Sequence, residues 1–345
     1  MIEKLNTSIL YTVKLGGAYE ILENIQNLIE SILDKSEFKN FEIHIYYEEN
    51  INQQIKKYFS LLNIKNISYF SSIKLSWYEW LKSSFAKSKN FTYLITMHSD
   101  CHFLTDKYDY KLINQVNNIS NLGIFTMLDE VYKRGFYYPQ LRKGFYIDQI
   151  QKNSRSLGID GEYCHQKINW HNKNIKIAKI LKILKLDVNY NMKLFNLFSQ
   201  LKIDKISFPK NKIKTHGLWS HLMCFKTENI KYFSNIINFD INHALYADED
   251  LCFLSMKSNL VNIFVPSVSF IHNRPEFGQT RSFDLITKDK KKVEKKFYQK
   301  WKFYPSTAGN FEEYKSLIKK IESLHGKKLT WSKNFESFDW DSFYI

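Results

Sequence analysis

Three short clusters of ionisable side chains have residue types and spacings that could do chemistry. They are His98, Asp100 and His102; Asp248, Glu249 and Asp250; and His272. Carboxylate oxygens and imidazole nitrogens are ligands for Mn²⁺, Mg²⁺ and similar ions, and such a cation can offset the charge of a diphosphate. The clusters are therefore candidates for a metal-assisted site.

Each cluster also has an ordinary structural interpretation. Asp100 could cap a following helix, and the acidic triplet 248–250 could begin a helix whose dipole favours negative charge. His272 could be a hydrogen-bonded histidine at the end of a strand. The strands and helices predicted around each cluster distinguish between these interpretations.

The first hundred residues alternate between strand and helix patterns. Strands are predicted at residues 8–13, 41–47, 66–70 and 91–97, and helices at 21–33, 53–62 and 77–87. The strand at 91–97 is almost entirely apolar or β-branched, which is typical of a central strand, and it leads directly into Asp100. Because α/β folds place their chemistry at the carboxyl ends of strands, this position favours a functional role.

The second half of the chain is less regular. Strands are predicted at residues 222–225, 262–265 and 267–271, and a helix at 288–301. Residues 175–186 form an amphipathic pattern with apolar residues on one face and lysines on the other, which suits packing onto the domain or contact with a membrane surface.

The 345-residue chain carries a formal charge of +15 and has a pI near 9.3. This excess favours an anionic partner, such as nucleic acid, an acidic membrane surface or a phosphate-bearing ligand, although solvated lysines on helix faces would also account for it. The sequence has no zinc finger, RRM signature or helix-turn-helix, so we expect no specific nucleic acid partner.

Four cysteines lie far apart without a CxxC pair, which excludes a zinc ribbon and a disulfide scaffold and fits a reducing cytoplasm. The N-terminus lacks the apolar stretch of a signal peptide, and no later segment is long and apolar enough to span a membrane. We therefore expect a cytoplasmic protein that can attach peripherally to the inner face of the plasma membrane.

Residues 246–272 resemble a long signature of family 2 glycosyltransferases. The segment YADEDLCF is followed by VNIFVP and then by VSFIH. In that family an acidic helix start leads to a strand that ends in Val-Pro and to a further strand that ends in a histidine. This order is far more specific than an isolated acidic triplet.

Other segments extend the resemblance over more than half of the chain. ITMHSDC, residues 95–101, is similar to the family's D-x-D metal motif, with His98 in place of the first aspartate and Asp100 at the second. WSHLMCF, residues 219–225, looks like the strand before the acidic motif, and Glu48 stands loosely where the family has its D-D-G-S. Residues 128–214 and the tail lie outside the resemblance.

The resemblance implies an α/β protein with the GT-A fold, which is a Rossmann-like nucleotide-diphospho-sugar transferase fold with a mixed sheet flanked by helices. Residues 1–280 would form the catalytic domain, with an acceptor-side helical and aromatic insertion at 128–215. Residues 281–345 would form a C-terminal helical extension.

The implied activity is inverting sugar transfer from a UDP-linked or other nucleotide-sugar donor to a glycan or lipid-linked acceptor. The acceptor would belong to a capsule, lipooligosaccharide or glycoprotein. Asp248 would be the catalytic base, and Asp100 and His272 would bind Mn²⁺ or Mg²⁺, with His102 as a further candidate ligand. The donor would also contact Thr12, Val13, Glu48 and His98, and the acceptor His216, Trp219 and Asp250.

Two alternatives stay open from the sequence. Because His98 replaces an aspartate, the chain could be a degenerate GT-A domain that binds a nucleotide or glycan without turnover. Its charge also allows a basic nucleic-acid-binding protein, which would show steeply salt-dependent binding.

Overall fold

The computed structural model describes residues 7–15, 20–62, 64–129, 136–137, 212–215, 217–218, 221–239 and 247–272, together with 292–301 apart from 294 and 298. The predictions for His216, Trp219 and residues 175–186 lie outside these ranges. None of the helices within the described ranges is long and apolar enough to cross a membrane.

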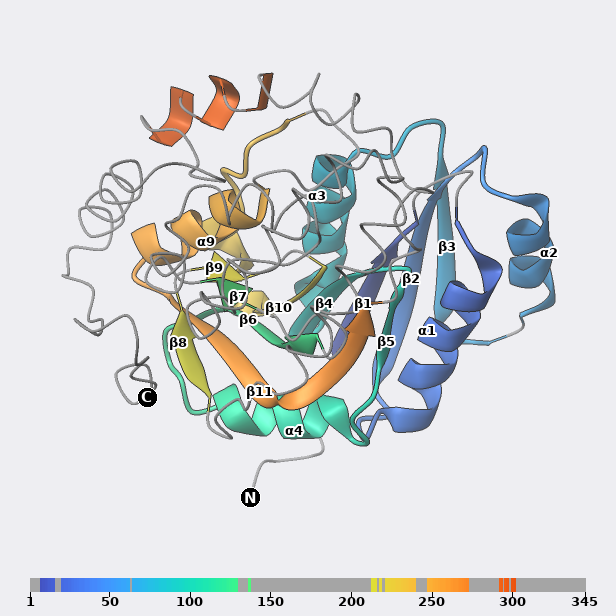
Figure 1. The fold of residues 1–345 in the computed structure, drawn as a ribbon, viewed down its shortest axis with the longest axis horizontal. Helices are drawn as coiled ribbons and strands as arrows, with labels where there is room; N and C mark the ends of the chain where they lie inside the picture. The colour runs from blue at the N-terminus through green and yellow to red at the C-terminus, as the bar shows by residue number, and fades with distance from the viewer. Residues whose placement is uncertain are drawn as a thin grey trace, which may run out of the picture.

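The amino-terminal half alternates strands with helices (Figure 1). Its elements are β1 (Ile9–Lys14), α1 (Leu22–Lys35), β2 (Phe41–Glu48), α2 (Gln53–Leu61), β3 (Ile67–Ser72), α3 (Trp77–Lys87), a 3₁₀ turn η2 (Ser88–Asn90), β4 (Tyr93–His98), β5 (Cys101–Phe103), α4 (Tyr108–Val116) and β6 (Leu122–Asp129). The later elements are β7 (Phe136–Tyr137), β8 (Ile213–Thr215), β9 (Gly217–Leu218), β10 (Leu222–Lys226), the 3₁₀ helix η5 (Thr227–Phe233), α9 (Ala247–Lys257) and β11 (Val261–His272).

The main sheet has the strand order β3-β2-β1-β4-β10-β6-β11-β5, and β8 pairs with β11. Strands β3, β2, β1 and β4 are parallel, β10 is antiparallel to both β4 and β6, and β11 is parallel to β6. Strands β1, β2, β4, β6 and β11 therefore end at one edge, which we call the carboxyl edge.

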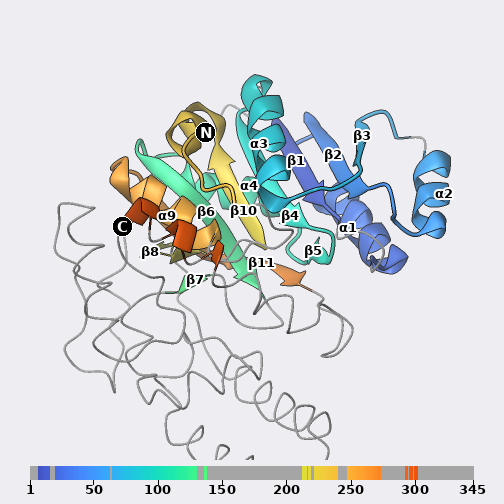
Figure 2. The same ribbon diagram turned by 90° about the horizontal axis from the view of Figure 1, so that it is seen from above.

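Helices cover both faces of the sheet. Apolar residues of α1, α2 and α4 pack on one face, whereas α3 and α9 pack on the other, together with Val293, Phe297 and Trp301 near the C-terminus. Figure 2 shows α1 and α3 on opposite sides of β1 and β2. Burial of this apolar surface on both faces is the main stabilising contribution to the layered fold.

Local sequence signals account for several boundaries. Ser76 begins α3 with a capping box, because its hydroxyl accepts from the Glu79 main-chain N–H while the Glu79 carboxylate accepts from the Ser76 N–H. The predicted helix at 77–87 is confirmed residue for residue, and the predicted strands and helices before it are confirmed to within two residues.

Two sequence-based interpretations of elements need correction. Asp100 is followed by the short strand β5, so it does not cap a helix. The two strands predicted at 262–265 and 267–271 form one long strand, β11, whose pairing with β6 shifts register between Val265 and Ser269.

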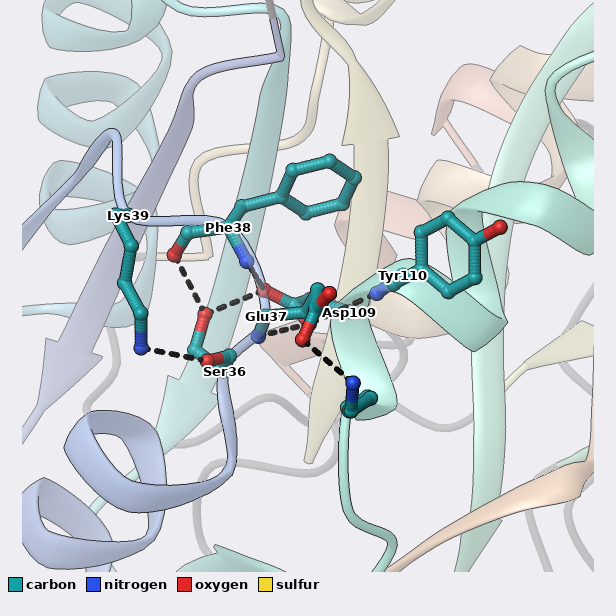
Figure 3. A network of polar contacts seen from close by, with 7 residues as sticks. Ser36, Glu37, Phe38, Lys39, Asp109 and Tyr110 are labelled. Atoms are coloured by element: carbon teal, nitrogen blue, oxygen red, sulfur yellow. Dashed lines mark hydrogen bonds and ion pairs between the residues drawn. The ribbon is translucent and has the colours of Figure 1, made fainter. Parts of the chain in front are cut away.

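A buried carboxylate ties α4 to the connection between α1 and β2 (Figure 3). Asp109 is fully buried and accepts hydrogen bonds from the Ser36 hydroxyl and from the main-chain N–H groups of Glu37 (2.9 Å), Phe38 (3.0 Å) and Tyr110 (2.8 Å). These donors compensate for the desolvation of the carboxylate. Asp109 thus holds the backbone turn between two elements.

Candidate active site

The sheet topology brings ionisable side chains from distant segments to the carboxyl edge. Lys14, Glu48, His98, Asp129 and His272 are the last residues of β1, β2, β4, β6 and β11. In parallel strands such residues lie at the same edge, as the Cα pairing of Lys14 with His98 shows. This edge is where the sequence predicted chemistry.

Asp100 and His272 meet at this edge. Asp100 Oδ2 lies 3.3 Å from Nε2 of His272, whose other ring nitrogen, Nδ1, lies 3.8 Å from Oδ2 of the buried Asp129. The pairing of β5 with β11 fixes the contact, because the Cα of Cys101 is paired with that of His272. The structure therefore brings together the two metal ligands predicted from the sequence.

Two more histidines lie beside this pair. The ring centroid of His221 is 4.0 Å from that of His272, and the ring of His98 is 5.6 Å from His221 and 6.1 Å from His272. We call His98, His221 and His272 the histidine cluster. Sequence analysis did not single out His221, although it belongs to the segment at 219–225 that resembles the family strand.

The geometry of Asp100 and His272 fits a divalent cation. Two ligands that bind one ion at about 2.1 Å and at right angles lie about 3 Å apart, close to the 3.3 Å separation observed. A carboxylate oxygen and an imidazole nitrogen suit Mn²⁺ and related ions, and the Asp129 carboxylate lies at ion-pair distance, 3.8 Å, from the second ring nitrogen of His272.

His102 does not join these groups. Its Cα pairs with Ile271, one residue away from the Cys101–His272 pair, and successive side chains of a strand point to opposite faces. Burial, together with the positive charge of Lys35, lowers the pKa of His102. Among the described residues His102 belongs to no potential metal-ligand group, so we leave it out of the proposed ligand set.

The two donor-side residues predicted on β1, Thr12 and Val13, lie inside the sheet. Thr12 and Val13 are fully buried, and both are paired with β2 on one side and β4 on the other. The main-chain groups of this central strand are engaged in the two ladders, and donor contact by Thr12 and Val13 stays a prediction. Glu48 lies at the carboxyl edge, and its Oε1 accepts from the Leu75 N–H at 3.1 Å.

Asp248, the predicted base, lies in the first turn of α9 and is 7% exposed. Near the other end of α9, Ser255 Oγ would lie only 2.1 Å from a Cβ built on Gly123, close to the start of β6. The helix therefore runs back along the sheet, and its first turn is directed toward the carboxyl edge.

Asp250, predicted to contact the acceptor, forms hydrogen bonds that connect α9 to two other segments of the chain. Its Oδ1 accepts from Lys300 Nζ at 2.6 Å and from Trp301 Nε1 at 2.8 Å, and its Oδ2 accepts from the Ile237 N–H at 2.7 Å. Burial raises the pKa of Asp250 and lowers that of Lys300, while the attraction between them opposes both shifts. Acceptor contact by Asp250 stays a prediction.

Comparison with solved structures identifies the fold class. The chain has the GT-A fold, a curled mixed sheet with flanking helices, and it is similar to the structure titled "Crystal structure of GalNAc-T7 with UDP, GalNAc and Mn2+". The TM-score is 0.54 at 11% sequence identity, over 94% of this chain and 55% of that chain. The chain thus spans about half the length of that relative. No family model and no curated protein matches the sequence.

Proposed function

We propose that the chain is a metal-dependent glycosyltransferase that moves a sugar from a nucleotide-sugar donor to a hydroxyl group of a glycan acceptor. The observation that carries this proposal is the Asp100–His272 pair at the carboxyl edge of a GT-A sheet. The similar structure holds UDP, GalNAc and Mn²⁺, which supports a nucleotide donor, a cation and a glycan acceptor.

In this proposal Asp100 and His272 hold the cation, and Asp129 positions His272 through its Nδ1. The bound cation would offset the negative charge that develops on the departing nucleoside diphosphate. Loss of Asp100 or His272 should therefore weaken donor binding and transfer together.

Asp248 acts as the general base. Its carboxylate removes the proton from the acceptor hydroxyl as that oxygen forms a bond to the anomeric carbon, and the bond from that carbon to the diphosphate breaks. Base catalysis of this kind is worth roughly 10²–10⁴-fold in rate. The burial of Asp248 limits its contact with water, so the acceptor hydroxyl would enter a partly dry environment.

The proposal extends to an inverting reaction, a UDP-linked donor, a surface-glycan acceptor and attachment to the inner face of the plasma membrane. The resemblance of residues 246–272 supports the inverting reaction and the surface-glycan acceptor, and the UDP held by the similar structure supports a UDP-linked donor. The charge of +15 supports attraction to anionic lipid. NMR of the product tests the stereochemistry, since retention of the donor's anomeric configuration would exclude direct displacement.

Thermal-shift measurements test donor binding. The protein is titrated with UDP-, GDP-, CMP- and dTDP-linked sugars, each with Mn²⁺, Mg²⁺ or a chelator, because a ligand specific to the folded state raises its stability. We expect one nucleotide to raise the Tm only with metal, and that effect should be lost in Asp100→Ala but kept in Asp106→Ala. The absence of any metal-dependent shift would contradict the proposal.

A second candidate is a binding domain without turnover, favoured by His98 at the position where the resembling family has an aspartate. It predicts the same thermal shift but no release of nucleoside diphosphate with any acceptor. Donor hydrolysis or transfer that depends on Asp248 would exclude it.

A further inference from the structure

We propose that His98, His221 and His272 form a nitrogen-rich metal site. Because of these nitrogens, the chain should bind Zn²⁺ most tightly, Mn²⁺ less tightly and Mg²⁺ least tightly. This inference deepens the proposed function, on which it rests for the role of the ion in transfer. Ion binding itself can be measured without any donor or acceptor, so the two proposals can fail separately.

The three histidines come from different strands that the sheet holds together. His98 ends β4, His221 immediately precedes β10, and His272 ends β11. The main-chain N–H of His98 donates to the carbonyl of His221 at 3.0 Å, and Cys101 Sγ donates to the same carbonyl at 3.5 Å. The positions of the ring-bearing residues are thus set by strand pairing.

The spacing of the rings allows one ion to be shared. Each histidine offers a nitrogen such that the three nitrogens all lie within 4.8 Å of one another. Ligands bound to a tetrahedral ion at about 2.1 Å lie about 3.4 Å apart, so small rotations of the side chains would complete the site. His221 and His272 are buried, which shields the cluster from water.

Ligand chemistry then sets the preference between ions. Imidazole nitrogen suits Zn²⁺ and other transition metals, for which affinity at nitrogen sites rises from Mn²⁺ to Zn²⁺. Mg²⁺ instead favours oxygen ligands and retains several waters. The three imidazoles supply three nitrogens, and the Asp100 oxygen, 3.3 Å from Nε2 of His272, belongs to a second potential ligand group with Cys101 and His272.

The orientation of the His272 ring supports its role as a metal ligand. Nε2 faces Asp100, and Nδ1 lies 3.8 Å from the Asp129 carboxylate. An outer carboxylate at the second ring nitrogen commonly orients a metal-binding histidine and fixes its tautomer. His102, half-buried on the other face of β5, lies outside this arrangement and provides a matched control.

The experiment is isothermal titration of the chelator-treated full chain with Zn²⁺, Mn²⁺ and Mg²⁺ in separate runs, with metal content confirmed by elemental analysis. We expect one ion per chain and the affinity order Zn²⁺, Mn²⁺, Mg²⁺. His221→Ala should weaken Zn²⁺ binding at least about 100-fold, since even loss of an outer partner costs 10–100-fold. His102→Ala should bind Zn²⁺ like the unaltered chain.

Equal affinity for Mg²⁺ and Zn²⁺, or unchanged Zn²⁺ binding in His221→Ala, would overturn the inference and leave three packed histidines without an ion. Should His221→Ala fail to fold, the half-buried His98→Ala serves as the second variant, with the same expected loss. Zn²⁺ binding without any donor turnover would support this site while contradicting the transferase proposal. Turnover by the unaltered chain that Mg²⁺ and Zn²⁺ support equally would do the reverse.

Discussion

Asp100 and Asp109 lie nine residues apart, yet their surroundings differ in kind. Asp109 is fully buried and accepts from three main-chain N–H groups and a serine hydroxyl (Figure 3). Asp100 is partly exposed at the carboxyl edge and faces the imidazole of His272. The first carboxylate holds the backbone together, whereas the second faces a side chain that can share an ion with it.

The comparison separates structural from functional carboxylates by their partners. Main-chain N–H donors are fixed by the fold and have no alternative role, so a carboxylate that they surround stabilises a turn. Imidazole can exchange a hydrogen bond for a metal bond. Asp250 accepts from one main-chain N–H, that of Ile237, and from the side chains of Trp301 and Lys300, so it lies closer to Asp109 than to Asp100 by this criterion.

The largest expected effect is on the rate of transfer and concerns Asp248, a carboxylate with a proposed functional role. Asp248→Asn should lower the rate of transfer roughly 10²–10⁴-fold, because the amide cannot accept the acceptor proton. Donor affinity and the Tm should stay close to those of the unaltered chain. Steady-state kinetics alongside donor titration measures both, and a fully active variant would assign the base to another residue.

On the structural side, Asp109→Ala should lower the free energy of unfolding by about 4 kcal/mol, because it leaves several buried N–H groups without an acceptor. Denaturant unfolding measures this change, with Asp106→Ala at a nearby exposed aspartate as the control. Metal affinity per folded molecule should not change. A stable Asp109→Ala variant that lost metal binding would contradict the assignment of a structural role to Asp109 and a metal-binding role to Asp100.

Variants of Asp250 and Lys300 test whether the carboxylate of Asp250 on α9 also has a structural role. Removing one member of a buried ion pair costs about 3 kcal/mol, whereas replacing both with neutral groups can be close to neutral. We therefore expect Asp250→Asn and Lys300→Met each to destabilise, and the double variant to recover much of the loss. Lys295→Met, at an exposed lysine, is the control in the same unfolding measurements.

The same pair has a pH signature. Because burial is the largest influence on the pKa of Asp250 and raises it, the folded state retains this proton at a higher pH than the unfolded state does. The stability linked to this group is therefore fully present below the ordinary aspartate pKa and is lost as pH rises through the raised value. Asp250→Asn should remove this part of the pH dependence of unfolding. An unchanged profile would contradict the shift.

Gly123→Ala gives the smallest expected effect. A Cβ at Gly123 would lie 2.1 Å from Ser255 Oγ and 2.8 Å from Asn262 Oδ1, so the side chains of Ser255 and Asn262 would have to shift. Overpacking of this kind costs about 1–3 kcal/mol. Adding Ser255→Ala should recover part of the loss in thermal unfolding, whereas no recovery would place the strain elsewhere.

The sequence predicted the alternating elements through β4 because their apolar periodicity follows their burial. It missed α4 and β6, whose strand leads to Asp129, and it divided β11 because Pro266 interrupts an otherwise continuous pattern. The strand predicted at 8–13 lies one residue earlier than β1, Ile9–Lys14, because apolar periodicity does not fix the last paired residue of a strand.

The candidate site was predictable in part. Asp100 and His272 were paired through a family resemblance, and their meeting depends on β5 pairing with β11, in which Cys101 is paired with His272, a register that periodicity does not contain. His221 stayed hidden because a histidine before a strand is common, and only the antiparallel insertion of β10 beside β4 brings it to His98. Pairing between strands so far apart in the sequence can be identified only from the three-dimensional structure.

The most direct test of the account is release of nucleoside diphosphate from a panel of nucleotide sugars, measured with Mn²⁺, Zn²⁺, Mg²⁺ or chelator, in the presence of glycan acceptors. We predict metal-dependent release with one class of donor that falls to background in Asp100→Ala and Asp248→Asn but persists in His102→Ala. Release that is insensitive to chelator and to both variants, or no release with any donor, would contradict the proposal that this GT-A fold carries a metal-dependent transferase.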